Sequence, residues 1–364
     1  MENRLARARA LPDGWETEPR TRERTGARRA LYHRRAGGRQ REGLLLWALA
    51  CALLPTLARA EPAPLGARNL APQHLFLLDP GPDLPERLAP GKTRLGIDLA
   101  YASIFTNRAG SNSDALLDME VARADLRYAL GVGRMEVEFD LPLLWTGAGL
   151  FDSVINSYHD AFNFPTGGRN TAPENRFAYR IRRGARAFDP KPGAGLGDAV
   201  LSVKSAVGSR RDLAARALVK LPTGSRSRGF GSEHADASVG LLGDARAGWF
   251  RFWGNLDAVY VGGSPDPALR LGSHWALAAG GTAALDVGRG VDVQLELHYF
   301  SSPYDTGLRA LDRDPVLFAL GVARSFGGLR ASFGMTEDVA VETSPDIALF
   351  LNLAWTGEAN APPR

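Results

Sequence analysis

The residues with the strongest chemical potential lie in one polar stretch of the chain. Ser157, His159 and Asp160 are the residue types of a hydrolytic set, in which a base activates a hydroxyl for attack. Residues two positions apart on a helix point in different directions, however, and such sets are assembled by the fold rather than by adjacency in sequence. Asp152, His159 and Asp160 could instead anchor the loop or bind a metal ion. We therefore expect no enzyme and no cofactor, keep a hydrolase around His159 as the alternative, and leave any metal unassigned.

The same stretch, residues 146–195, carries a surplus of basic side chains. Arginines on an outer surface could bind lipopolysaccharide phosphates or attract an anionic solute, and an ordinary solvated loop explains them equally well. A possible helix over 151–162 could constrict a pore, and the alternation in 176–181 could extend neighbouring strands. The candidates for constriction or binding are Asp152, His159, Asp160, Arg169, Arg180, Arg182 and Arg183.

A second group of ionisable residues recurs at every other position of apolar segments. Over 291–299, Val, Val, Leu, Leu and Tyr alternate with Asp, Gln, Glu and His, and alternate side chains of a strand point to opposite faces. The polar faces could sort solutes along a permeation path, or they could form an ion-pair lattice that fills a narrow barrel. The lumen or selectivity candidates are Asp98, Glu136, Glu138, Asp140, Lys204, Arg216, Lys220 and Glu296.

About a dozen segments between 91 and 355 share this period of two. Tight turns at one end alternate with longer polar connections at the other, and this sorting of loops by length is typical of outer-membrane barrels. We expect an all-β fold, an antiparallel up-and-down transmembrane β-barrel of about 12 strands with one long extracellular loop. An even strand number places both termini in the periplasm. The expected turns are 131–133, 209–212, 245–247, 288–290 and 325–327, and the expected long connections are 106–116, 146–195, 222–233, 262–272, 301–313 and 338–345.

Charge and composition divide the chain into regions. Residues 1–60 hold 13 arginines against 6 acids, whereas the remainder has 31 basic and 34 acidic residues, so the basic surplus belongs to a leader and gives no nucleic-acid footprint. The apolar run 43–57 followed by Ala58-Arg59-Ala60 predicts a cleaved secretory signal. We therefore expect a leader and signal at 1–60, a Pro-rich periplasmic lead-in at 61–91, the barrel at 92–357 and a tail at 358–364.

Several segments resemble a known family. They are Arg68 to Pro72, Asp118-Met119-Glu120, Asp152 to Arg169, Gly195 to Asp198 and Leu221 to Gly224. Together they resemble an uncharacterised family of proteobacterial outer-membrane proteins, catalogued as domain of unknown function 3187, over roughly 65–356. This resemblance implies an outer-membrane barrel and brings no established substrate or site.

The expected role is passive passage or binding of small solutes in the outer membrane of a Gram-negative bacterium, with loop 146–195 controlling the mouth. The expected partners are outer-membrane lipid and lipopolysaccharide, the barrel-assembly machinery and an unidentified small solute, but no nucleic acid. One alternative is an outer-membrane enzyme acting on lipid or lipopolysaccharide. Another is a structural barrel with a closed lumen.

Overall fold

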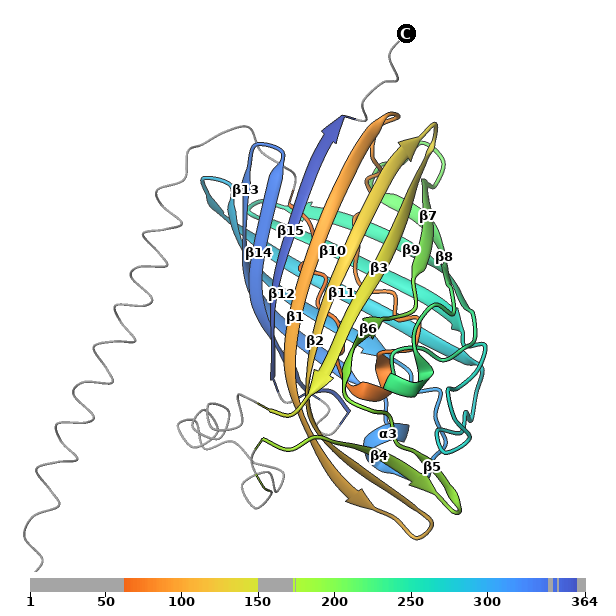
Figure 1. Ribbon diagram of the computed structural model, residues 1–364. Coiled ribbons are helices and arrows are strands. Elements are labelled where there is room, and N and C mark those ends of the chain that lie inside the picture. Colours follow the sequence, from red (N-terminus) through yellow and green to blue (C-terminus); the bar gives the residue numbers. More distant parts are fainter. Residues whose placement is uncertain (1–61, 150–172, 174, 340–342, 346, 359–364) are drawn as a thin grey trace, which may run out of the picture. The chain divides into compact units, whose positions relative to one another are not determined.

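Twelve antiparallel strands close into one barrel, so the predicted fold class is confirmed (Figure 1). The computed structural model describes residues 62–149, 173, 175–339, 343–345 and 347–358. Closure follows from the pairing of β1 with both β2 and β15. The strands of the wall are β1 (Lys92–Ala109), β2 (Ser113–Val132), β3 (Met135–Gly147), β7 (Val200–Ala206), β8 (Leu213–Lys220), β9 (Asp236–Ala247), β10 (Phe250–Tyr260), β11 (Trp275–Gly288), β12 (Val291–Phe300), β13 (Val316–Phe326), β14 (Leu329–Asp338) and β15 (Ile347–Glu358).

The wall turns its apolar side chains outward and its polar side chains inward. In β12, Leu295 and Leu297 are 42% and 47% exposed, whereas Glu296 between them is 1% exposed. A soluble protein would bury the leucines and expose the glutamate. The reversed pattern fits a barrel whose outer surface meets lipid. Among the described residues, no helix is long and apolar enough to cross a membrane.

The two ends of the barrel differ, as the loop lengths predicted, although the turn expected at 245–247 lies at 248–249 because β9 continues to Ala247. At the turn end, short connections join the strands at 133–134, 207–212, 248–249, 289–290 and 327–328. At the loop end lie the longer connections, three short helices, η1 (Pro72–His74), η3 (Arg226–Arg228) and α3 (Arg309–Asp312), and three short strands, β4 (Ala178–Arg183), β5 (Arg186–Phe188) and β6 (Gly193–Leu196). Figure 1 places β4, β5 and α3 together at this end.

The long connection expected at 106–116 is wrong. β1 and β2 remain paired as far as Ala109 and Asp114, so only residues 110–112 turn the chain. The polar Asn107 and Arg108 resemble loop residues in sequence, but here they belong to a hairpin that continues beyond the neighbouring strands. β4 pairs with β2, the second strand of this hairpin, from Ser113↔Arg183 to Asp118↔Ala178. The alternating stretch 176–181 therefore does extend a strand, as predicted, and the long connection 146–195 contains β4, β5 and most of β6.

Residues 62–91 lie inside the barrel rather than forming an outer periplasmic lead-in as expected. Near Ala63 this segment bonds to Arg330 close to the turn end, and at Phe76 it contacts Lys220 close to the loop end. It then returns to Gly91, whose N–H donates to the Gly131 carbonyl at the turn end. We call residues 62–91 the plug.

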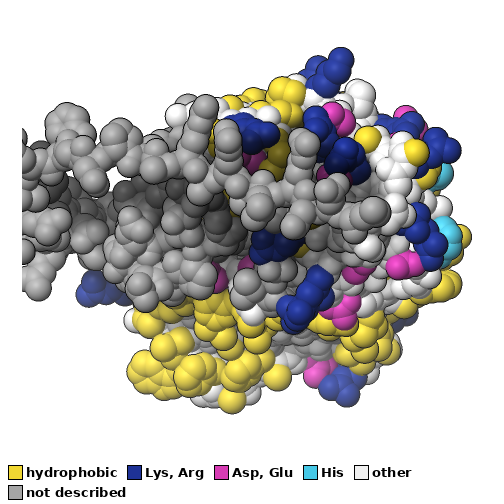
Figure 2. Space-filling view, turned by 90° about the horizontal axis from the view of Figure 1, so that it is seen from below, with side chains coloured by type: hydrophobic (Ala, Val, Ile, Leu, Met, Phe, Trp, Pro, Cys, Tyr) yellow, Lys and Arg dark blue, Asp and Glu magenta, His cyan; other side chains and the backbone are white. Residues whose placement is uncertain are grey.

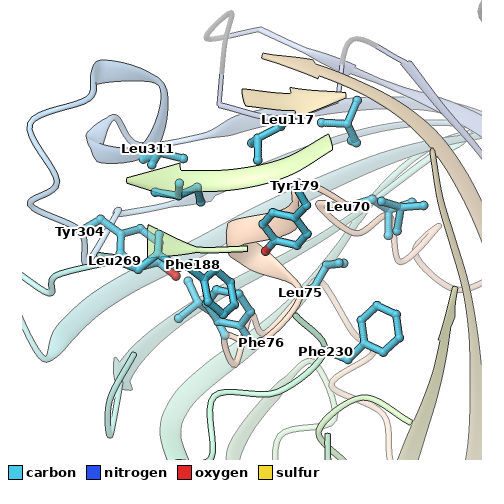
Figure 3. Packing of buried hydrophobic residues seen from close by; sticks show 14 of the residues in the cluster. Leu70, Leu75, Phe76, Leu117, Tyr179, Phe188, Phe230, Leu269, Tyr304 and Leu311 are labelled. Carbon is cyan, nitrogen blue, oxygen red and sulfur yellow. The ribbon is translucent and has the colours of Figure 1, made fainter. Parts of the chain in front are cut away.

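The loop end is sealed by apolar packing around the middle of the plug. Leu75, Phe76, Leu77 and Leu78 are all buried there, and they join side chains from the wall and from the loops (Figure 3). Tyr179 and Phe188 of the β4–β5 hairpin meet edge to face, with ring centroids 5.6 Å apart. The described part of the long loop thus covers the plug, and a compact core closes this end of the lumen.

Candidate functional site

The first anchor of the plug is a carboxylate held by backbone N–H groups. The Glu296 carboxylate accepts from Leu65 N at 3.0 Å, Gly66 N at 3.3 Å and Ala67 N at 2.9 Å. Gly66 has φ +68°, a left-handed conformation that lets successive N–H groups converge on one anion. Thr282 Oγ1 donates to the same carboxylate at 2.9 Å. Burial removes the water molecules that would hydrogen-bond this carboxylate, and these four donors take their place.

The second anchor is a set of ion pairs between the plug and one side of the wall. Arg68 reaches Asp125 at 3.2 Å and Asp140 at 2.9 Å. Lys204 Nζ lies 3.0 Å from Asp83 and donates to the Leu84 carbonyl at 2.8 Å. These contacts are charge-assisted, and the wall residues Asp125, Asp140 and Lys204 are almost completely buried whereas Arg68 and Asp83 are partly exposed. The plug therefore adds counter-ions to those of the wall, where Arg123 pairs with Asp125 and Glu136 with Lys204.

The third anchor is Lys220, which is 1% exposed on β8. Its Nζ lies 3.0 Å from Asp198 and 3.1 Å from Asp236, and it donates to the Phe76 carbonyl at 2.5 Å. Asp236 also accepts from Leu78 N at 3.0 Å. One buried cation thus ties the plug to the β6–β7 connection and to the start of β9 at the loop end.

Two tyrosine hydroxyls of the loop end donate hydrogen bonds to the short helix η1 of the plug. Tyr179 donates to the Pro72 carbonyl at 3.2 Å, and Tyr304 donates to the Gln73 carbonyl at 2.7 Å. Burial raises the pKa of both hydroxyls above the usual value for tyrosine. Both groups therefore remain protonated donors across the physiological pH range.

Small residues of the wall leave room for the plug. A Cβ on Gly280 would lie 2.8 Å from Pro82 Cγ, and one on Gly321 would lie 2.9 Å from Leu65 Cδ2. A Cβ on Gly131 would collide with the Ala89 carbonyl oxygen. Glycine at these three inward-facing positions permits the close approach of the plug.

Two cavities remain beside the plug. The larger, of about 690 Å³, lies at the turn end between the plug and parts of β1, β14 and β15; we call it the vestibule. The smaller, of about 120 Å³, lies further inside, between the plug and a stretch of the wall that contributes mostly charged groups of β1, β2, β3, β7 and β8. Gly66, Pro82, Asp83 and Arg127 line both cavities. The plug and the Arg127 side chain therefore form the boundary between them.

The predicted lumen residues all lie on the inner side of the wall, and most are engaged in ion pairs. Beyond the anchors above, Arg216 pairs with Asp257 at 2.6 Å, and Asp98 pairs with Arg127 at 2.8 Å. Arg94 bridges Glu136 at 2.5 Å and Glu138 at 3.2 Å. This is the ion-pair lattice that the alternating charges allowed. A role of these residues in selectivity stays a prediction.

The predicted loop residues are only partly within the described structure. Asp152, His159, Asp160 and Arg169, together with the possible helix 151–162, lie outside the described residues. The three others lie on β4. Arg182 pairs with Asp114 at 2.7 Å and Arg180 with Asp189 at 3.5 Å. These two side chains are 55% and 52% exposed, so each pair contributes little to stability.

Basic side chains gather on the loop-end face, between acidic ones (Figure 2). Arg183, the last residue of β4, is half-buried at this end of the barrel. In the part of the chain that the structure describes, no cluster of three or more His, Cys, Asp or Glu residues could hold a metal ion.

The sequence did not identify the plug residues as part of the site. Arg68 and Asp83 stand in a Pro-rich stretch without periodicity, and their partners are distant in the chain. The run Leu75 to Leu78 was the available signal, because four consecutive apolar residues are unexpected in a solvated periplasmic segment.

Comparison with known proteins gives one family and a group of barrels. A family model described as protein of unknown function (DUF3187) matches residues 43–356, and no curated protein matches. An outer membrane channel (COG4313) from Pseudomonas putida F1 shares 16% identity, with a TM-score of 0.49, over 77% of this chain and 100% of its own. The CymD monoaromatic hydrocarbon channel shares 12% identity, with a TM-score of 0.36, over 80% of this chain and 94% of its own. The P. putida toluene transporter TodX shares 9% identity, with a TM-score of 0.36, over 74% and 91%.

Proposed function

We propose, starting from the fact that this chain belongs to the DUF3187 family of proteins of unknown function, that it is a gated outer-membrane barrel for small solutes. The plug, residues 62–91, is the gate. Its apolar middle closes the loop end, and its two limbs leave the vestibule at the turn end. The observation that carries the proposal is that these limbs are anchored by hydrogen bonds and ion pairs with the wall.

Polar anchoring favours a gate because water can replace it. When the plug moves away, Glu296, Lys204 and Asp140 can each exchange a plug contact for water or for a neighbouring charge. The net free energy of such an exchange is a small difference between large opposing contributions. An apolar interface around the limbs would offer no such exchange.

The route beside the plug follows one side of the wall. The vestibule and the inner cavity adjoin at Asp83 and Arg127, and the inner cavity continues to Lys220 near the loop end. Solutes passing here would meet side chains of both signs at close range, so charge would decide which of them pass.

The plug is also the feature that favours a second candidate, a structural barrel whose lumen never opens. Anchors at Glu296, Arg68, Lys204 and Lys220 span the length of the lumen. A hydrolase around His159 stays a prediction, because its residues lie outside the described structure.

Single-channel conductance separates the gate from the closed barrel. The first variant lacks residues 62–88. The second carries Pro82→Cys and Gly280→Cys, a pair suited to a disulfide because a Cβ on Gly280 would lie 2.8 Å from Pro82 Cγ. Cys51, the only native cysteine, lies in the predicted leader and would not interfere in the mature protein.

We expect brief openings of the unmodified barrel, none from the oxidised double-cysteine variant, and their return on reduction. The deletion variant should conduct continuously while it still changes its mobility on gels when boiled. A folded deletion variant that conducts no more than the oxidised one would contradict the gate, and silence of the reduced double-cysteine variant would do the same.

A further inference from the structure

The vestibule has the size and the lining of a ligand site. Its volume of about 690 Å³ falls within the range of about 300–1,000 Å³ that is usual for pockets that bind small molecules. About half of the lining belongs to the plug and the rest to β1, β14, β15, the turn 327–328 and Arg127 of β2. The cavity therefore exists as described only while the plug is seated.

The charged groups that line the vestibule are mostly basic. Five cations, Arg87, Lys92, Arg94, Arg127 and Arg330, stand against two carboxylates, Asp83 and Glu86, a surplus of +3. Within a cleft walled by protein, such a surplus raises the local concentration of anions.

Several of these groups pair with side chains that lie outside the lining. The Asp83 carboxylate is engaged by Lys204 at 3.0 Å. The carboxylates that pair with Arg94, Arg127 and Arg330 are Glu136, Glu138, Asp98 and Asp292, and none of these four lines the vestibule.

The arginines keep hydrogen-bonding capacity beyond these pairs. Arg94 makes both of its bonds to carboxylates through Nη2 alone. Arg87 donates one long bond, 3.3 Å from Nη1 to the Gly133 carbonyl. A guanidinium has five N–H donors in a planar fork. Arg87 can still bind a carboxylate in two-pronged fashion through Nε and Nη2, whereas Arg94, whose Nη2 is engaged, can add only single bonds from Nε or Nη1.

The same lining offers apolar surface beside the cations. Pro64, Leu65, Pro82, Leu84 and Leu88 of the plug all border the vestibule. A ligand that satisfies both parts of this lining has a negatively charged group and an apolar body.

We infer that the vestibule binds a small amphipathic organic anion, with a carboxylate at the Arg87–Lys92–Arg94 side and an apolar body against the plug. This inference rests on the proposed function and names the class of solute that the gate would admit from the turn end. Binding would tie the ligand to the seated plug, because the plug supplies the apolar half of the site.

Equilibrium dialysis of the purified, folded barrel tests the inference without measuring conductance. The probes are cyclohexanecarboxylate, cyclohexylmethanol and cyclohexylmethylammonium, which share one apolar body and differ in charge, together with acetate, which has the charge alone. We expect the carboxylate to bind at least about tenfold more tightly than the other three, the equivalent of one charge-assisted contact.

Variants locate the site. Arg87→Gln and Lys92→Gln should each weaken binding of cyclohexanecarboxylate about tenfold. Arg210→Gln is the matched control, because Arg210 is an exposed basic residue of a turn and does not line the vestibule. Binding should vanish when residues 62–88 are deleted, because half of the lining is then missing.

Equal affinity for the carboxylate and the ammonium probe, or unchanged binding in both vestibule variants, would overturn the inference while leaving the gate intact. An anionic lipid retained by the purified barrel, identified by mass spectrometry and displaced by none of the probes, would overturn the assignment to a dissolved solute. A barrel that binds the carboxylate as expected but never conducts would refute the gate and leave the site.

Discussion

At the scale of single residues, the lumen is organised by buried charges that need partners. Glu136 illustrates this, since its carboxylate lies 2.5 Å from Arg94, 3.4 Å from Lys204 and 2.6 Å from the plug's Leu88 N–H. A buried charge that loses its partner is strongly destabilising, commonly by about 3–5 kcal/mol. Where the wall can supply a second partner, as for Glu136, the loss of the plug contact is offset. Lys220, between two carboxylates, stays paired in the same way.

Neighbouring residues of β12 should respond to substitution in opposite ways. Leu295→Arg places a charge on the lipid side and should lower the stability of the barrel by about 2–4 kcal/mol. Glu296→Gln replaces a carboxylate that accepts three plug N–H groups and should loosen the plug, at about 1–3 kcal/mol, with little effect on strand pairing.

Two readouts separate these effects. Urea unfolding followed on gels reports the barrel, and thiol labelling of an added Ala67→Cys reports the plug, because Ala67 is 3% exposed when seated. Leu295→Arg should change only the unfolding midpoint, and Glu296→Gln should change only the labelling rate. Similar changes in both readouts for both variants would disprove the assigned faces.

At the scale of elements, sequence was sufficient wherever one side of a strand meets lipid and the other meets the lumen. β12 and β15 show the alternation cleanly, so their existence and facing could be predicted. The β1–β2 tip could not, because beyond the rim its side chains no longer alternate between lipid and lumen. Leu117 and Met119 instead pack into the core that seals the loop end.

The plug escaped prediction for a related reason. Its conformation depends on contacts such as Ala67–Glu296, which are 229 residues apart, and not on any local propensity. The lumen residues could be predicted because each is a charged residue that alternates with apolar residues along a strand. Their partners on the plug lie in a segment without such alternation. Only the glycines opposite the plug and the run Leu75 to Leu78 carried information about it.

Two adjacent glycines of β11 offer a test of plug seating. A Cβ on Gly280 would collide with Asn255 Oδ1 and meet Pro82 at 2.8 Å, whereas a Cβ on Gly281 would meet only the Trp253 carbonyl, at 3.9 Å. Gly280→Ala should therefore push the plug away and raise the frequency of openings severalfold. Gly281→Ala, on the exposed side, should behave like the unmodified protein. Indistinguishable conductance of the two variants, with both barrels folded, would mean that the fit between plug and wall does not control opening.

At the scale of the whole molecule, one end of the barrel is closed and the other contains the vestibule. Apolar packing seals the loop end, and the vestibule lies at the turn end beside the start of the plug. The predicted signal ends at residue 60, so the mature chain would begin at the turn end, next to the vestibule. In an outer membrane this end should face the periplasm, because barrels of this kind place their short turns there.

Orientation can be measured with single cysteines and a membrane-impermeant maleimide on intact cells. Ser111→Cys lies at the exposed tip between β1 and β2, and Arg210→Cys lies at the exposed turn between β7 and β8. We expect labelling of the first in intact cells and of the second only after the outer membrane is opened. Both variants should fractionate with outer membranes and migrate differently on cold and boiled gels, because a closed barrel resists unfolding by detergent. Labelling of Arg210→Cys in intact cells would reverse the topology and turn the vestibule toward the outside. Recovery as a soluble protein with a single gel mobility would exclude the membrane barrel itself.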